Sequence, residues 1–152
     1  MKIISTNRKA KYHYHILETY EAGIELKGSE VKSLRNRGCS IDESFVRIEA
    51  GEAFIYNMHI PEFEKASYFK ADPKRTRKLL LHKKEIKRLA GLVTQKGFTI
   101  IPLKAYFNQG GLVKVEIALC KGRKYYDKRK KIKEEIMQRE TQRILKRFGK
   151  KI

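Results

Sequence analysis

Alternation of apolar and polar residues at every second position runs through several short segments of the chain. Every second side chain is aliphatic from residue 113 to 119, and every second one is aromatic or aliphatic from 54 to 60. A period of two is typical of a strand with one face turned to a core. Segments rich in β-branched and aromatic residues predict further strands over residues 12–20, 45–49 and 98–107. Turn signals separate these segments at Glu21-Ala22-Gly23, Ala50-Gly51-Glu52 and Asn108-Gln109-Gly110-Gly111.

Two segments carry the helical period instead. Residues 83–95 place apolar side chains at i, i+3, i+4 and i+7, and Gly97 marks the end of this helix. Residues 29–37 form a shorter amphipathic segment that stops at Gly38. Several short strands with few helices predict a mainly β fold, a small closed antiparallel barrel with flanking helices. The oligonucleotide-binding type is one such barrel, and the pattern alone does not separate it from others.

Charge divides the chain into two parts. Lys and Arg number 36 against 17 Asp and Glu, and residues 121–152 hold 14 of the basic residues with only 4 acidic ones. We therefore expect a globular body over residues 1–122 and a basic tail over 123–152. The tail has an apolar stripe opposite a basic face, which predicts a helix that is disordered in the free protein and forms on a partner.

A formal net charge of +19 opposes compaction and favours a polyanionic partner. Nucleic acid is the leading class, and an anionic membrane surface is the alternative. The sequence contains no run of roughly 20 apolar residues and no secretory signal. Two distant cysteines give neither a disulfide framework nor a thiolate metal site. We expect a cytoplasmic protein.

Basic residues crowd the segment from Lys74 to Lys84, which leads into the start of the predicted helix. Cations there oppose the helix dipole, so an external phosphate is the favoured explanation and a solvated loop is the alternative. Three leucines, residues 79–81, interrupt the segment. One of them would be exposed and able to pack under an RNA base, although burial of all three is equally compatible with the spacing.

Other candidate residues divide between binding and structure. The arm from Asn7 to Lys11 is either a phosphate-binding segment or a frayed terminus. The strand register favours Tyr12 and Tyr14 as core residues, which leaves Tyr125 and Tyr126 as the better stacking candidates. His13 and His15 would share a strand face, but no third metal ligand accompanies them, so structural roles are favoured. No catalytic constellation is present, and we expect neither an enzyme nor a cofactor or metal site.

Five ordered stretches together resemble the SsrA-binding protein (small protein B) family. They are residues 21–35, 42–46, 51–53, 75–86 and 121–129. The resemblance implies an oligonucleotide-binding-type barrel that binds the tRNA-like domain of transfer-messenger RNA (tmRNA). It further implies that the complex enters stalled bacterial ribosomes with elongation factor Tu and GTP and rescues them by trans-translation, with no reaction catalysed by the protein.

The resemblance assigns RNA-contacting roles to Asn7, Glu21, Leu80 and His82. Glu21 cannot bind phosphate, but it can accept hydrogen bonds from base amino groups or ribose 2′-OH groups. With the basic clusters and their neighbours, the predicted RNA-binding set comprises Asn7, Arg8, Lys9, Glu21, Gly23, Lys32, Arg35, Arg75, Arg77, Lys78, Leu80, His82 and Lys83.

For the tail, the resemblance implies a place in the decoding centre and mRNA channel of the small ribosomal subunit, where it stands in for a codon–anticodon duplex. Tyr126 departs from the His of many members, and residues 61–71 follow the family pattern poorly. We expect a monomer that contacts rRNA, and the alternatives are a structural ribosomal protein or a generic basic RNA-binding module. The predicted decoding-centre residues are Gly122, Arg123, Lys124, Tyr126, Asp127, Lys128 and Arg129.

Overall fold

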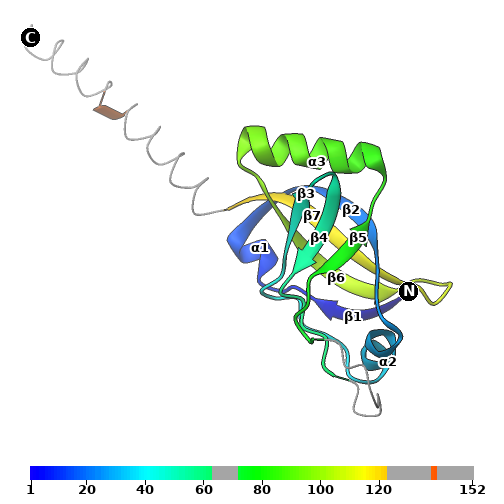
Figure 1. The fold of residues 1–152 in the computed structure, drawn as a ribbon. Coiled ribbons are helices and arrows are strands. Elements are labelled where there is room, and N and C mark those ends of the chain that lie inside the picture. Colours follow the sequence, from blue (N-terminus) through cyan, green and yellow to red (C-terminus); the bar gives the residue numbers. More distant parts are fainter. Residues whose placement is uncertain (63–71, 123–137, 140–152) are drawn as a thin grey trace, which may run out of the picture.

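The computed structural model describes residues 1–62, 72–122 and 138–139 (Figure 1). Seven strands and three helices follow one another along residues 1–62 and 72–122. In chain order they are β1 (Lys2–Thr6), α1 (Ala10–His13), β2 (Tyr14–Ile24), α2 (Gly28–Asn36), β3 (Phe45–Glu49), β4 (Glu52–Tyr56), β5 (Arg77–Leu80), α3 (Lys83–Lys96), β6 (Thr99–Phe107) and β7 (Val113–Gly122).

All seven strands belong to one antiparallel sheet with the order β1-β6-β3-β4-β5-β2-β7. β6 also pairs with β7, and this pairing closes the sheet into a ring. The inward side chains of the strands fill the ring, among them Ile55, Val115 and Ile117, which have no exposed surface. The predicted mainly β, antiparallel fold is confirmed.

Local sequence explains the longest helix, α3. Leu89 is the fully buried residue of α3, and Ile86 and Val93 lie on the same side of the helix. Gly97 ends α3 with a φ of 65°, a left-handed conformation that glycine adopts without strain. α3 lies across one end of the ring, and α2 lies near the opposite end (Figure 1). Among the described residues, no helix is long and apolar enough to cross a membrane.

The structure corrects several predicted elements in the first half of the chain. Residues 21–23, predicted to be a turn, lie inside β2, where each of them pairs with β7. The strand predicted over residues 54–60 ends at Tyr56, because Asn57 has a φ of 61° and leaves the extended conformation. Tyr12, predicted to be a core residue, lies in α1 and is 79% exposed.

Two strands were missing from the prediction. β1 lies at the N-terminus, and β5 replaces the loop that the basic residues suggested. Leu79 of β5 pairs with Ala53 of β4, and both side chains are buried. Burial of alternate residues in a four-residue strand stabilises it despite its charged neighbours. β7 ends at Gly122, and of the tail predicted to be helical only residues 138–139 are described; both are helical.

Candidate nucleic-acid interface

Three adjacent strands bring Leu80, Gly23 and Lys114 together. Gly23 of β2 pairs with Leu80 of β5 on one side and with Lys114 of β7 on the other. A Cβ atom added to Gly23 would lie 3.2 Å from the Cβ of Leu80, tighter than ordinary van der Waals contact. The glycine therefore leaves room for the leucine, whose side chain stays 49% exposed. Leu80 is thus the exposed member of the leucine run, as the resemblance implied, while Leu79 is core.

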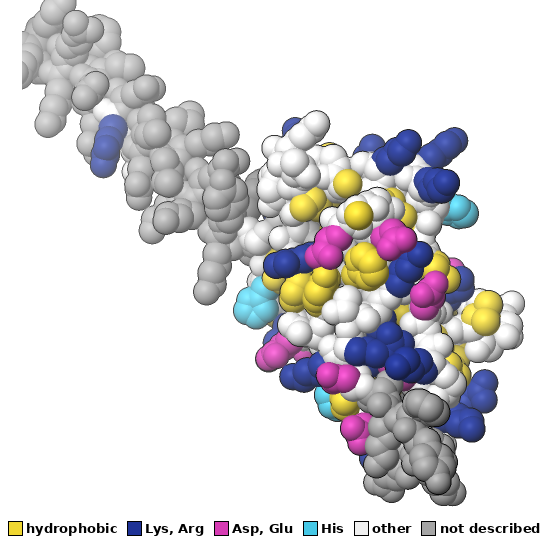
Figure 2. Space-filling model, in the orientation of Figure 1, with side chains coloured by type: hydrophobic (Ala, Val, Ile, Leu, Met, Phe, Trp, Pro, Cys, Tyr) yellow, Lys and Arg dark blue, Asp and Glu magenta, His cyan; other side chains and the backbone are white. Residues whose placement is uncertain are grey.

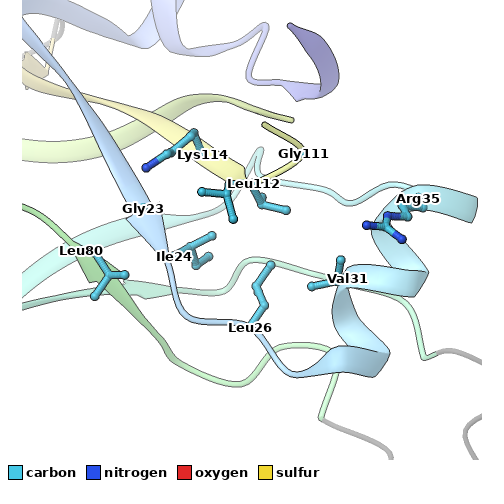
Figure 3. A pocket seen from close by; sticks show the side chains of 10 residues that line it. Gly23, Ile24, Leu26, Val31, Arg35, Leu80, Gly111, Leu112 and Lys114 are labelled. Atoms are coloured by element: carbon cyan, nitrogen blue, oxygen red, sulfur yellow. The ribbon is translucent and has the colours of Figure 1, made fainter. Parts of the chain in front are cut away.

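A groove of about 360 Å³ opens beside this row (Figure 3). Apolar residues of β2, α2 and the turn between β6 and β7 line it. Two cations, Arg35 and Lys114, are also among its lining residues. Leu112, which follows the turn, is 63% exposed. The lining residues are Gly23, Ile24, Leu26, Val31, Arg35, Leu80, Gly111, Leu112, Val113 and Lys114. An apolar floor with nearby cations fits a nucleotide, because a base or ribose packs on the floor while the cations bind phosphate.

Glu21 places a carboxylate on the exposed side of β2, two residues before Gly23. Its carboxylate accepts a hydrogen bond from the hydroxyl of Tyr106. Burial, together with this carboxylate, raises the pKa of Tyr106 to about 12, so the hydroxyl remains a donor at neutral pH. Glu116, opposite Glu21, forms an ion pair with Lys104 at 3.2 Å. A carboxylate has about four acceptor sites, so Glu21 can still accept hydrogen bonds from RNA.

Asn7 is not part of a mobile arm. Its side chain is 7% exposed, its backbone N–H donates to the carbonyl of Leu103 at 2.8 Å, and its Nδ2 donates to that of Pro102 at 3.1 Å. Its Oδ1 is buried without a hydrogen-bond partner among the described residues. A buried acceptor without a hydrogen bond lowers the stability of the fold, unless a donor from a bound partner reaches it.

A second hollow adjoins Asn7. It is lined by Thr6, Asn7, Arg8, Lys11 and Tyr12. The exposed ring of Tyr12 can stack on a base, and two basic residues lie beside it. Thr6 pairs with Lys104, Lys104 with Glu116, and Glu116 with Glu21. One row of paired residues therefore crosses four strands from Thr6, in the second hollow, to Glu21, two residues before Gly23 in the groove.

Arg77 was predicted to bind RNA, but the structure places its side chain inside the protein. The residue is 1% exposed. Its guanidinium pairs with the carboxylate of Glu30 at 2.5 Å and donates to the carbonyl of Met58 at 2.6 Å. Arg75 also donates to Glu30, at 3.1 Å through its Nε. Arg77 therefore links α2 to β5 and is unavailable to phosphate.

Glu30 is the anion at the centre of this cluster and is itself 3% exposed. Burial alone would raise the pKa of its carboxyl. Hydrogen bonds from Arg75 and the backbone of Lys27, with the charge of Arg77, outweigh burial and lower that pKa. The carboxylate stays charged because three donors surround it.

The family model described as SmpB protein matches residues 4–147. The chain belongs to the SmpB family. An SsrA-binding protein of Thermosipho africanus (strain TCF52B) is 56% identical over 97% of this chain and 99% of its own length. One of Caldicellulosiruptor bescii is 54% identical over 97% of this chain and 93% of its own.

A solved structure agrees with the sequence comparison. It is described as "tmRNA-SmpB: a journey to the center of the bacterial ribosome", and one of its chains is 54% identical to this one. The match has a TM-score of 0.65 and covers 78% of this chain and 83% of that chain. At this identity the likeness extends beyond the fold to the family.

The remaining predicted residues occupy varied positions. His82 precedes α3 as its N-cap, and its backbone N–H donates to Glu85 at 3.2 Å. Lys78 is half-buried and pairs with Glu52 at 3.4 Å. Besides Glu21 and Leu80, the exposed members of the predicted set are Arg8, Lys9, Lys32, Arg35, His82 and Lys83. The predicted decoding-centre residues after Gly122 lie outside the described residues.

Sequence reasoning missed Lys114, Leu112, Tyr106 and Tyr12. Lys114 had a usable signal, since it is the polar member of an alternating strand and so faces outward. Leu112 follows a double-glycine turn, where a large apolar residue has few neighbours. Among the described residues, no group of three His, Cys, Asp or Glu side chains is placed to hold a metal ion.

Proposed function

We propose that this chain binds transfer-messenger RNA and delivers it to stalled bacterial ribosomes for trans-translation. The observation that carries the proposal is the row of Leu80, Gly23 and Lys114 beside the groove, with Glu21 two residues away on β2. It presents an apolar surface, a cation and a hydrogen-bond acceptor together. The names of the relatives and the tmRNA–SmpB structure support the choice of RNA.

Each part of the interface has a distinct chemical task. Leu80 and Leu112 offer apolar surface to a base or ribose, because both side chains are exposed. Arg35 and Lys114 attract the backbone through charge alone, which gives affinity without sequence preference. Glu21 repels phosphate and can accept hydrogen bonds from base amino groups or ribose 2′-OH groups. It therefore favours an RNA surface that presents such donors over one that presents phosphate. Recognition of shape therefore adds to a general attraction for polyanions.

The wider assembly belongs to the same proposal. The tail, with Gly122 at its start and Asp127-Lys128-Arg129 beyond it, would enter the decoding centre in place of a codon–anticodon duplex. Elongation factor Tu with GTP would accompany the RNA, and the chain would act as a cytoplasmic monomer that catalyses no reaction. Truncation before Asp127 should preserve affinity for tmRNA and abolish tagging of stalled peptides in a reconstituted translation system.

The first test is affinity for tmRNA against an unrelated tRNA, measured by gel shift across a salt series. We expect a preference for tmRNA that persists at high salt. Leu80→Asn should weaken tmRNA binding about tenfold, which corresponds to about 1.4 kcal/mol. The reason is that the RNA would cover the half of the Leu80 side chain that is exposed in the free protein. Leu17→Asn is the matched control, since Leu17 is 38% exposed and does not line the groove.

Equal affinity for both RNAs, lost steeply as salt rises, would contradict the proposal. Binding would then be driven only by release of counterions from phosphate. The chain would be a generic basic RNA-binding module or a structural ribosomal protein. Quantifying the protein against ribosomes in cells separates these two outcomes, because a structural ribosomal protein is present at one copy per ribosome.

A further inference from the structure

Glu21 is held by a neutral donor, whereas the acidic residue opposite it is held by a cation. Glu21 accepts a hydrogen bond from the hydroxyl of Tyr106, and it forms no ion pair among the described residues. Glu116, which pairs with Glu21 across the β2–β7 ladder, forms its ion pair with Lys104 at 3.2 Å. Acidic side chains also lie next to basic ones on the face shown in Figure 2. Glu21 thus keeps a negative charge that no ion pair compensates, inside an interface for a polyanion.

Tyr106 reaches Glu21 from two strands away. Tyr106 belongs to β6 and Glu21 to β2, and β7 lies between these strands. Directly opposite residues of an antiparallel pair point to the same side of the sheet. Tyr106 pairs with Lys114 of β7, and Lys114 pairs with Gly23 of β2. The tyrosine therefore lies in the row that leads to the groove, and its hydroxyl crosses β7 to meet the carboxylate.

The ring of Tyr106 is fixed by its surroundings. The residue is 5% exposed, although its row faces outward. The Nζ of Lys104 lies 5.6 Å from the ring centroid, within the range of a cation–π interaction, and the same lysine is tied to Glu116. A ring packed in this way has few alternative rotamers. The fold therefore sets the position of the hydroxyl, and with it one oxygen of Glu21.

Two carboxylates that face each other on β2 and β7 are unfavourable, because like charges directly opposite one another destabilise a strand pair. Lys104 neutralises Glu116, while the hydroxyl of Tyr106 donates to Oε2 of Glu21. Oε1 of Glu21 has no hydrogen bond within the part of the chain that the structure describes. A phenol donates a hydrogen bond without cancelling the charge of its acceptor. Glu21 therefore remains a strong acceptor and still repels phosphate.

We propose that Tyr106 is a positioning residue for RNA recognition, whose hydroxyl holds the Glu21 carboxylate with Oε1 turned to a hydrogen-bond donor of the RNA. The inference rests on the proposed function for its choice of RNA. The donor is a base amino group or a ribose 2′-OH group, because both donate and phosphate does not. Tyr106 makes no contact with the RNA in this arrangement and acts only through Glu21. Preference for tmRNA then depends on a side chain that is buried.

A double-mutant cycle tests whether Tyr106 acts through Glu21. Affinity for tmRNA and for an unrelated tRNA is measured by gel shift for the wild type, Tyr106→Phe, Glu21→Ala and the double variant. Tyr106→Phe removes only the hydroxyl, and it should weaken tmRNA binding about tenfold, because the carboxylate is no longer held. In the Glu21→Ala background the same change should have no further effect, because the group that the hydroxyl positions is gone.

The salt series separates positioning from the loss of a phosphate contact. Tyr106→Phe removes no cation, so the slope of log affinity against log salt should stay at the wild-type value while affinity falls at every salt concentration. Tyr56→Phe is the matched control, because Tyr56 donates to Glu49 at 2.7 Å and does not line the groove. It removes the same kind of hydrogen bond and should leave tmRNA affinity unchanged. Circular dichroism gives the melting temperature of each variant, so that gel shifts are run where all are folded.

Modified RNA identifies the donor that Glu21 meets. Four transcripts of tmRNA each carry the 2′-deoxy form of one nucleotide type. If the donor is a 2′-OH group, one of these transcripts should bind the wild type and Tyr106→Phe equally well. If the donor is a base amino group, all four should keep the tenfold difference between the two proteins, because the amino groups are unchanged.

Two results would overturn the inference. One is tmRNA affinity at the wild-type level in Tyr106→Phe. The other is a loss of the same size in the wild-type and Glu21→Ala backgrounds, because Tyr106 would then act independently of Glu21. If the wild type shows no preference for tmRNA over the unrelated tRNA, the proposed function fails. The coupling between Tyr106 and Glu21, measured with the tRNA, then decides the inference separately.

Discussion

Replacing Arg77 with methionine should destabilise the fold without weakening RNA binding by the folded protein. The guanidinium is fully buried, and it meets the Glu30 carboxylate and the carbonyls of Met58, Arg75 and Pro73. Removing one partner of a buried ion pair costs about 3–5 kcal/mol, because the groups left behind are buried without it. Such a loss is a large share of the roughly 5–15 kcal/mol that stabilises a typical domain.

Thermal unfolding followed by circular dichroism measures this effect. A loss of 3–5 kcal/mol corresponds to a fall in melting temperature of roughly 10–20 °C for a domain of this size. The RNA gel shift, run at a temperature where the variant is folded, should give the wild-type salt slope. Lys114→Met is the matched control, because it should lower RNA affinity and leave the melting temperature nearly unchanged.

The opposite pattern would refute this reasoning. Suppose that Arg77→Met melts like the wild type while the slope of log RNA affinity against log salt falls by about one. The guanidinium would then bind an RNA phosphate and not Glu30. Glu30→Gln gives an independent check, since it neutralises the anion of the same cluster and should also lower the melting temperature.

Two further predictions follow from other contacts. Gly23→Ala should weaken tmRNA binding by displacing Leu80, whereas Gly28→Ala should leave gel-shift affinity unchanged, because an added Cβ meets nothing within 4 Å at Gly28. The pKa of Glu18 is lowered from 4.5 to about 2, first by the hydrogen bond from Arg88 and then by that from Tyr20. Because the pKa of Glu18 is lower in the folded state, its carboxylate stabilises the fold fully above about pH 4.5. This contribution to the free energy of unfolding is lost as the pH falls through about 2. The melting temperatures of the wild type and Glu18→Gln should therefore differ at about pH 6 and converge near pH 2, and a gap that persists there would contradict the ion pair.

The sequence determined the elements whose signals are local. The alternation in residues 113–119 predicted β7, because a period of two reports directly which side chains face the core. The spacing of Ile86, Leu89 and Val93 and the stop at Gly97 predicted α3 within one residue. Charge and the ordered family-like stretches indicated an RNA partner, because charge and motif order are properties of the sequence itself.

Contacts between distant segments were decided only by the tertiary structure. The basic run around Arg77 predicts that its side chain is exposed. The side chain is buried instead, because its guanidinium donates to Glu30, which lies 47 positions earlier in the chain. Residues 21–23 carry a turn signal, yet pairing with β7 keeps them extended, because ladder hydrogen bonds outweigh local preference. Leu80 is exposed because Gly23, across the strand pair, has no side chain to cover it. Composition limits the class of partner, while the site depends on which side chains the folded sheet leaves at its surface.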